Sequence, residues 1–219
     1  MVKIYITGCA RSGTTLLARL FNAFQDCYVI NEEVSVDDFC SIGESYFDGW
    51  DSKPKFLVGK RTEFTVFGQI LSTHEKERQL SLLESNNVVI INCVRDGRYV
   101  VDGWVKEWGI YNPFVWMQSI LDSIYHMTKI QITVRYEVLI SDPNFVQREL
   151  PHRISGLISS FDFSSYPSFV PEKCFESKSE SRKLRPIENK IGGVPDSYLK
   201  VPNNVMVFNS LLSYLQYKL

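Results

Sequence analysis

The chain has 219 residues, of which 44% are hydrophobic and 22% charged, and its formal net charge is −1. This length and composition are typical of one globular α/β domain, and we expect a single domain spanning residues 1–219. The near-neutral charge excludes bulk electrostatic binding to nucleic acid or to an anionic membrane, so any anion site must be built locally.

Apolar, β-branched runs alternate with helical patterns over most of the chain. Strands are expected at 3–7, 27–31, 55–60, 88–94 and 130–136, and helices at 14–23, 62–84, 97–108 and 113–128. This alternation predicts a three-layer αβα fold with a central parallel sheet. Beyond Pro143 we expect an amphipathic helix at 145–162, a basic polar stretch at 172–190 and a terminal helix at 203–218.

The five cysteines are odd in number and form no CxxC pair, and the three histidines are scattered. We therefore expect buried free thiols in a reducing compartment and no metal site. The first strand pattern begins directly after Met1, and no apolar run approaches the about 18 residues that a membrane span needs. These features favour a cytoplasmic protein without a membrane span.

A glycine-bounded loop follows the first strand and opens the first helix. Residues 8–15 read GCARSGTT. Gly8 and Gly13 allow the backbone to turn tightly and bring its N–H groups near a polyanion. The helix beginning near Thr14 adds N–H groups and a positive dipole end, and Thr15 adds a hydroxyl. The context of strand, loop and helix indicates a phosphate site.

The positively charged residue of this loop, Arg11, is at an unusual position in the sequence. Nucleoside triphosphate loops have lysine directly after the second glycine, where this chain has Thr14. Arg11 instead precedes Gly13 by two positions. A guanidinium there predicts an anionic diester or phosphosulfate that is held without an obligatory metal ion.

The run ITGCARSGTTLL resembles the 5′-phosphosulfate loop of the sulfotransferase superfamily, in the form found in tyrosylprotein sulfotransferases and their bacterial relatives. The resemblance implies a P-loop nucleoside triphosphate hydrolase-like fold. It also implies sulfuryl transfer from 3′-phosphoadenosine 5′-phosphosulfate, as co-substrate, to an acceptor hydroxyl or amine. The donor would contact Gly8, Cys9, Ala10, Arg11, Ser12, Gly13, Thr14 and Thr15.

Two further family positions have counterparts here. The strand 88–94 ends before Arg95, which matches the arginine that holds the donor's 3′-phosphate, and guanidinium suits phosphate geometry. The family serine eight positions later is Gly103 in this chain, a departure that removes a hydroxyl worth about 1 kcal/mol. Lys60 matches the lysine that stabilises charge on the leaving bridging oxygen, although Arg61 lies beside it.

The acceptor's proton needs a base. Cytosolic family members use a histidine two residues after the lysine, where this chain has Thr62. The resemblance to the tyrosylprotein branch instead implies a glutamate of the Glu32–Glu33 pair, which follows the second strand, as the base. Separately, crowding of two carboxylates can raise the pKa of one. Glu33 is the first candidate, Glu32 the second and Glu63 the third.

Later segments have weaker counterparts in the family. Residues 134–143, VRYEVLISDP, resemble a segment after the last core strand that we interpret as mostly structural. The resemblance also implies a basic loop over the adenosine and the 3′-phosphate. Its candidate residues are Ser179, Arg182, Lys183 and Arg185. Aromatic residues of 34–55 and 108–125 are expected to form the pocket for a small-molecule, glycan or lipid acceptor.

Two alternative functions fit parts of the pattern. A P-loop kinase would bind ATP with magnesium, and the missing lysine after Gly13 argues against it. A degenerate relative would bind a nucleotide or a protein partner without turnover, and Gly103 is the feature that favours it. If the loop binds the phosphosulfate of a sulfotransferase donor, the structure must also have an open, anion-sized hollow in front of Arg11.

Overall fold

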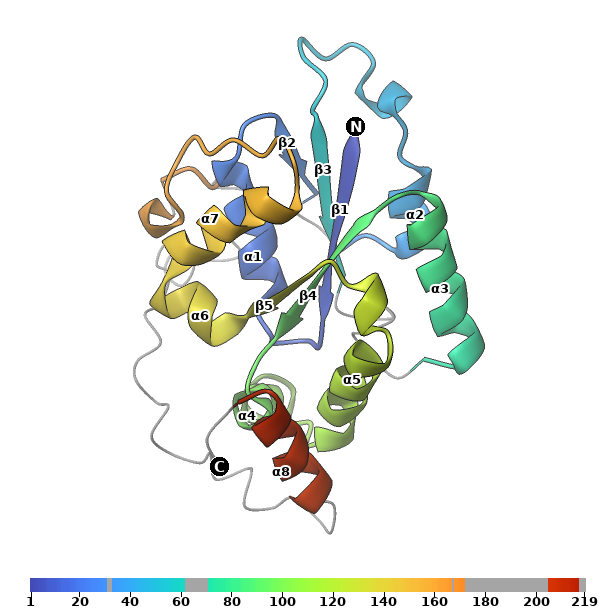
Figure 1. Cartoon of the computed structure of the whole chain (residues 1–219), viewed down its shortest axis with the longest axis vertical. Coiled ribbons are helices and arrows are strands. Elements are labelled where there is room, and N and C mark those ends of the chain that lie inside the picture. The colour runs from blue at the N-terminus through green and yellow to red at the C-terminus, as the bar shows by residue number, and fades with distance from the viewer. Residues whose placement is uncertain (31–32, 62–70, 167, 172–204, 217–219) are drawn as a thin grey trace.

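The computed structural model describes residues 1–30, 33–61, 71–166, 168–171 and 205–216. Five strands form one sheet in the order β2-β3-β1-β4-β5, and every neighbouring pair is parallel. This arrangement confirms the expected α/β class with a central parallel sheet (Figure 1). The strands are β1 (Val2–Gly8), β2 (Cys27–Val29), β3 (Phe56–Lys60), β4 (Val89–Val94) and β5 (Ile132–Arg135).

The central strands are apolar on both faces because helices cover both. Ile4 and Ile6 of β1 pack on one face, while Tyr5 between them packs on the other. Side chains alternate along a strand, so a strand buried on both sides becomes a continuous apolar run. In register, Ile4 pairs with Val58 of β3 and with Val89 of β4.

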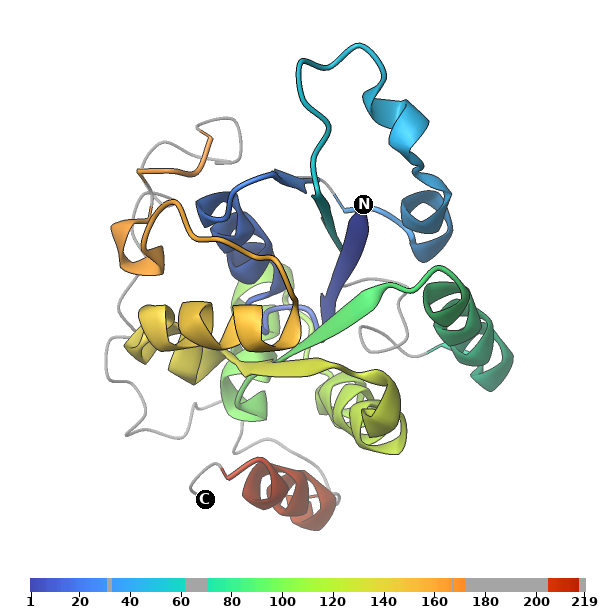
Figure 2. The same ribbon diagram turned by 45° about the horizontal axis from the view of Figure 1, so that its top comes forward.

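Three apolar clusters join the sheet to its helices. Figures 1 and 2 show how these helices are arranged around the sheet. The first lies under α1 (Thr14–Leu20), α6 (Tyr136–Ser141) and α7 (Pro143–Arg153) on one face. The second lies under α2 (Val36–Ser41) and α3 (Thr73–Ser85) on the other face. The third joins the end of β4 to α4 (Gly97–Trp108), α5 (Pro113–Tyr125) and α8 (Val205–Tyr214).

Short 3₁₀ turns continue or connect these elements. They are η1 (Phe21–Ala23), η2 (Glu44–Phe47), η3 (Met127–Lys129) and η4 (Phe163–Ser165). Thus the expected helix 14–23 is α1 followed by η1, and the expected helix 113–128 is α5 followed by η3. Within the described ranges, no helix combines the length and apolarity that a bilayer crossing requires.

The prediction of one helix over 145–162 was wrong. α7 begins at Pro143, capped by the Asp142 side chain, and ends at Arg153. Pro151 lies in its last turn, where a proline opposes further helix. Gly156 follows with a φ of 88°, a left-handed conformation that ends a helical path. The strand expected at 130–136 is also shorter, because α6 already begins at Tyr136.

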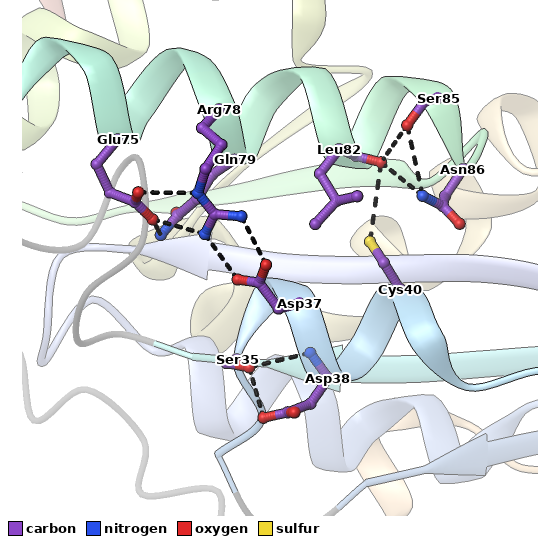
Figure 3. A network of polar contacts seen from close by, with 10 residues as sticks. All are labelled: Ser35, Asp37, Asp38, Cys40, Glu75, Arg78, Gln79, Leu82, Ser85 and Asn86. Carbon is purple, nitrogen blue, oxygen red and sulfur yellow. Dashed lines mark hydrogen bonds and ion pairs between the residues drawn. The ribbon is translucent and has the colours of Figure 1, made fainter.

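Polar contacts tie α2 to α3 (Figure 3). Each helix begins at a serine cap, Ser35 for α2 and Ser72 for α3. Arg78 of α3 donates to both carboxylate oxygens of Asp37 at 2.6 and 2.7 Å and also to Glu75 of its own helix. These contacts join the two helices at the protein surface.

The strand order places a crevice at one end of β1. After β1 the chain builds β2 and β3 on one side and then crosses to β4 on the other. In open parallel sheets, the loops that leave the carboxyl ends on either side of such a crossing diverge and leave a ligand-sized space. The loop after Gly8, the end of β3 at Lys60 and the end of β4 at Val94 meet at this point.

Candidate active site

A hollow of about 550 Å³ opens at the carboxyl ends of β1, β3 and β4. Its wall comes from the loop after β1, the first turn of α1, the strand ends, the end of α4 and the start of α6. The lining residues are Ala10, Arg11, Gly13, Thr14, Thr15, Leu16, Glu33, Lys60, Arg95, Trp108 and Tyr136. A second hollow, of about 310 Å³ between β5 and α7, contains none of the predicted site residues.

The two loop glycines are required by their surroundings. Gly8 has a φ of 146°, and a Cβ there would collide with the carbonyl oxygen of Cys93 on β4. Gly13 has a φ of 95°, and a Cβ there would enter the ring of Tyr136. Arg11 also has a left-handed φ, 74°, which is costly for a residue with a side chain. The loop is therefore held in a conformation that its own backbone does not prefer.

Three consecutive carbonyl oxygens of the loop accept hydrogen bonds, the first from within the loop and the other two from other elements. The backbone N–H of Ser12 donates to Cys9 O at 3.0 Å, and its hydroxyl donates to the same oxygen. The indole of Trp104 donates to Ala10 O at 3.1 Å, and Arg95 donates to Arg11 O at 3.0 Å. A carbonyl that already accepts a hydrogen bond repels an incoming anion less, so this pattern favours an anion in front of the loop.

Arg95 is positioned by its neighbours on three elements. Its backbone carbonyl accepts the indole N–H of Trp116 of α5 at 3.0 Å. Its guanidinium lies 4.2 Å from the ring centroid of Tyr136 and 5.8 Å from that of Tyr99. Stacking on aromatic faces leaves the guanidinium edge available for hydrogen bonds. The side chain is thus oriented before any ligand arrives.

Lys60 and Glu33 form an ion pair on the β3 side of the hollow. The Nζ of Lys60 lies 3.1 Å from Oε1 of Glu33. The Lys60 side chain is only 7% exposed, whereas that of Glu33 is 36% exposed. An ammonium group that is this buried needs a partner, and the carboxylate provides one. The arrangement brings a proton acceptor and a cation together at the mouth of the hollow.

Arg11 faces the opposite side, toward α4. Its Nη2 lies 3.7 Å from Oε2 of Glu107. Its side chain passes over Gly103, where an added Cβ would lie 3.4 Å from Nε of Arg11. Among the described residues, eight of those expected from the sequence line this hollow: Ala10, Arg11, Gly13, Thr14, Thr15, Glu33, Lys60 and Arg95. Gly8, Cys9 and Ser12 do not line it, and Gly103 lies beneath Arg11.

Cys9 plays no nucleophilic part in this arrangement. The thiol is buried behind the loop, and burial raises its pKa far above the ordinary value, as it also does for Cys93. A neutral thiol is a poor nucleophile and a poor metal ligand. Among the described residues, no three His, Cys, Asp or Glu side chains gather into a metal-ligand group.

Comparisons with known proteins bear on the fold. No family model and no curated protein sequence matches the chain. Among solved structures, the sulfotransferase domain from the Synechococcus PCC 7002 olefin synthase superposes with a TM-score of 0.63 at 15% identity, covering 100% of this chain and 96% of that one. The sulfotransferase domain from the curacin biosynthetic pathway gives 0.62 at 14% identity, with coverages of 99% and 98%.

The chain has the sulfotransferase-domain fold. Both neighbours are matched over nearly their full lengths, so the likeness covers the whole sheet and its helices rather than the phosphate loop alone. The fold resemblance inferred from ITGCARSGTTLL is confirmed by this independent structural match.

One residue of the hollow was missed by sequence reasoning. Tyr136 was interpreted as part of a structural segment, yet its ring contacts both Gly13 and Arg95. Trp108, the last residue of α4 and the first of the range 108–125 expected to form the acceptor pocket, also lines the hollow and is half exposed. The signal for Tyr136 was available, since it directly follows the end of β5, and ligands of open parallel α/β sheets bind at the carboxyl ends of the strands.

Several predicted residues lie outside the described part of the chain. They are Glu32, Thr62, Glu63, Ser179, Arg182, Lys183 and Arg185. Their assignments stay predictions. Glu33 is the member of the glutamate pair that the structure describes, and it lines the hollow.

The expected acceptor pocket from 34–55 was wrong for its aromatic part. Phe47 of η2 makes edge contacts with Tyr28 of β2 and with Trp50, at centroid distances of 5.5 and 5.1 Å. Glu44 of the same turn pairs with the N-terminal amine of Met1 at 3.1 Å. This cluster therefore lies near the amino end of β1, whereas the hollow opens at the carboxyl ends of the strands. Figure 1 shows these two ends of the sheet.

Proposed function

We propose that the protein transfers a sulfuryl group from 3′-phosphoadenosine 5′-phosphosulfate to the hydroxyl or amine of an acceptor. One observation carries this proposal. Three cationic side chains, Arg11, Lys60 and Arg95, come from three separate elements and line the same hollow as the glycine loop. A ligand with several anionic groups explains why these three cations lie around one hollow. Without an anion between them, cationic side chains are not stabilised by lying close to one another.

Each residue has a role in this proposal. The backbone N–H groups of Gly8–Thr15 bind the 5′-phosphosulfate, with Arg11 as the cation of the loop. Arg95, stacked on Tyr136, binds the 3′-phosphate as an oriented guanidinium. Lys60 lies at the end of β3 and stabilises negative charge on the bridging oxygen as it leaves.

The chemical step needs only the residues of the hollow and the two substrates. The bond between the sulfur and the bridging phosphate oxygen breaks, and its electron pair stays on that oxygen. The acceptor oxygen or nitrogen forms the new bond to sulfur, and its proton passes to the carboxylate of Glu33. The products are a sulfated acceptor and adenosine 3′,5′-bisphosphate, and no metal or oxidant is consumed.

A kinase function is the main competitor. The chain lacks the lysine that holds the β- and γ-phosphates of ATP, and the residue in its place, Thr14, is buried. The test compares the shift in melting temperature that adenosine 3′,5′-bisphosphate gives with the shift from ATP and magnesium. We expect stabilisation by the bisphosphate in magnesium-free buffer. A larger shift with ATP and magnesium contradicts the proposal.

Transfer itself is tested with ³⁵S-labelled donor and a panel of phenolic, sugar and hydroxylated lipid acceptors. The wild type is compared with Arg11→Ala and with Lys106→Ala, a matched change on the exposed face of α4. We expect labelled product from the wild type and from Lys106→Ala, and a loss of at least about tenfold in Arg11→Ala. Equal rates in the wild type and Arg11→Ala contradict the proposal.

A further inference from the structure

The backbone of Val34, the residue after Glu33, is held by hydrogen bonds on both sides. Its N–H donates to the backbone carbonyl of Lys60 at the end of β3, at 3.1 Å. Its carbonyl accepts the hydroxyl of Tyr5, from the middle of β1, at 2.7 Å. Glu33 directly precedes this fixed residue, and its Oε1 lies 3.1 Å from the Nζ of Lys60. The chain beside the proposed base is therefore attached to two strands of the sheet.

Gly59 of β3 allows Val34 to lie directly against the sheet. A Cβ at position 59 would lie 2.9 Å from Cγ1 of Val34 and 2.5 Å from Cδ2 of Phe39. At such distances one of the groups has to move. Tyr5 is the register partner of Gly59, and its ring packs against Phe39 with a centroid distance of 5.1 Å. The close approach of Val34 to β3 brings its carbonyl within reach of the Tyr5 hydroxyl.

The Tyr5 side chain is built to donate this hydrogen bond. It is 1% exposed, in the apolar cluster under α2 and α3. Burial raises the pKa of its phenol far above the ordinary value, because the charged form loses its hydration. The hydroxyl therefore stays protonated at neutral pH. Tyr5 is not part of the wall of the hollow, so it acts on a ligand only through other residues.

We infer that Tyr5 is a positioning residue for the proton acceptor: its hydroxyl holds Val34 so that the carboxylate of Glu33 stays beside Lys60. A buried hydroxyl needs an acceptor, and here the acceptor belongs to the residue next to the proposed base. The Glu33 side chain is itself 36% exposed, so its own packing gives it little orientation. This inference rests on the proposed function, because it concerns the proton acceptor of the same reaction.

Tyr5→Phe removes the hydroxyl and retains the ring. We expect kcat for sulfuryl transfer to fall at least about tenfold, because a displaced base loses its alignment with the acceptor. KM for the donor and the dissociation constant of adenosine 3′,5′-bisphosphate should change less than about twofold, since the loop residues are untouched. Tyr28→Phe, which removes a hydroxyl from β2 beside the same apolar cluster, is the control and keeps the wild-type kcat. An unchanged kcat in Tyr5→Phe overturns the inference.

A double variant separates positioning of the base from a general loss of structure. In a Glu33→Gln background, Tyr5→Phe should lower kcat by less than about twofold, because the group that Tyr5 positions is already absent. A further fall as large as that in the wild-type background shows that the hydroxyl acts through something other than Glu33, which overturns the inference.

Hydrogen exchange of the Val34 amide, followed by NMR, tests the contact without any activity. This N–H donates to Lys60, and the Tyr5 hydroxyl holds the carbonyl of the same residue. Tyr5→Phe should therefore speed its exchange at least about tenfold, whereas Tyr28→Phe leaves it unchanged. Equal protection of Val34 in Tyr5→Phe and the wild type overturns the inference.

The two levels of the account fail differently in these experiments. A wild type that transfers no sulfuryl group to any acceptor contradicts the proposed function and the inference with it. An active wild type, together with an equally active Tyr5→Phe variant, overturns the inference alone.

Discussion

Lys60 and Glu33 are joined by an ion pair of 3.1 Å, with the lysine almost fully enclosed and the glutamate facing the hollow. Lys60 ends β3, and its backbone carbonyl also accepts the N–H of Val34, so the chain around Glu33 is fixed to the strand end. The proposed leaving-group cation and the proposed base therefore share one position in the fold. A substitution can remove the charge of Lys60 or the carboxylate of Glu33 separately.

Lys60→Met retains the length of the side chain and removes its charge. We expect the rate of sulfuryl transfer to fall by about 10²–10³, because the charge acts on the leaving oxygen in the transition state. The dissociation constant of adenosine 3′,5′-bisphosphate should change by less than about tenfold. This product lacks the sulfuryl group and the bridging oxygen whose charge Lys60 stabilises in the transition state. Single-turnover transfer and calorimetry measure the two effects. An unchanged transfer rate excludes Lys60 from the chemistry.

Glu33→Gln retains the shape of the side chain and removes the base. We expect kcat to fall by about 10²–10⁴ without loss of affinity for the bisphosphate. Glu77→Gln, on the exposed face of α3, is the matched control and keeps wild-type activity. A Glu33→Gln enzyme with the wild-type kcat and pH profile shows that another residue takes the proton.

Gly13 and Gly109 offer a comparison within one chain, because both have a positive φ but only Gly13 has a neighbour in the way. Gly109 ends α4 with a φ of 66° and open space where a Cβ would stand. Gly109→Ala should lower the free energy of unfolding by about 1–2 kcal/mol. Gly13→Ala adds the collision with Tyr136 and should cost about 1–3 kcal/mol more.

Urea denaturation measures both variants. Gly13→Ala should also lose nucleotide binding, whereas Gly109→Ala keeps it. Equal destabilisation of the two variants contradicts the contact between Gly13 and Tyr136.

Two basic residues of α3 should differ sharply in their effect on stability. Lys76 pairs with Asp122 of α5 at 2.6 Å, and the two side chains are only 10% and 11% exposed. Lys76→Met leaves a buried carboxylate without its cation and should cost about 3–5 kcal/mol. Arg78 makes more contacts, with Asp37 and Glu75, but at the surface (Figure 3).

Arg78→Ala should cost less than about 1 kcal/mol, because exposed pairs contribute little. Thermal unfolding of both variants gives the comparison. The double variant Lys76→Met/Asp122→Leu should recover most of the loss of Lys76→Met. A larger effect at Arg78 than at Lys76 contradicts the ranking.

The sheet and the glycine-bounded turn between β1 and α1 could be predicted from the sequence because their signals are local. Buried parallel strands appear as short apolar runs, and a loop with two glycines between strand and helix has few structural solutions. The positions of Lys60 and Arg95 at the hollow could be predicted for the same reason, because Lys60 is the last residue of β3 and Arg95 directly follows β4. Their roles stay predictions. The hollow required in front of Arg11 is present.

Other features depend on contacts between distant segments. The Arg11 side chain passes over Gly103, and the Tyr136 ring contacts residues 13 and 95; neither pairing leaves a local pattern. The aromatic cluster around Phe47 was misplaced because composition does not indicate which end of the sheet a loop covers. The end of α7 was missed although Pro151 and Gly156 both signalled it.

A crystal structure with adenosine 3′,5′-bisphosphate tests the central claim most directly. We expect the 5′-phosphate oxygens within about 3 Å of backbone N–H groups of residues 13–15, and the 3′-phosphate in contact with the Arg95 guanidinium. A nucleotide bound elsewhere, or a hollow that stays empty at saturating nucleotide, contradicts the account.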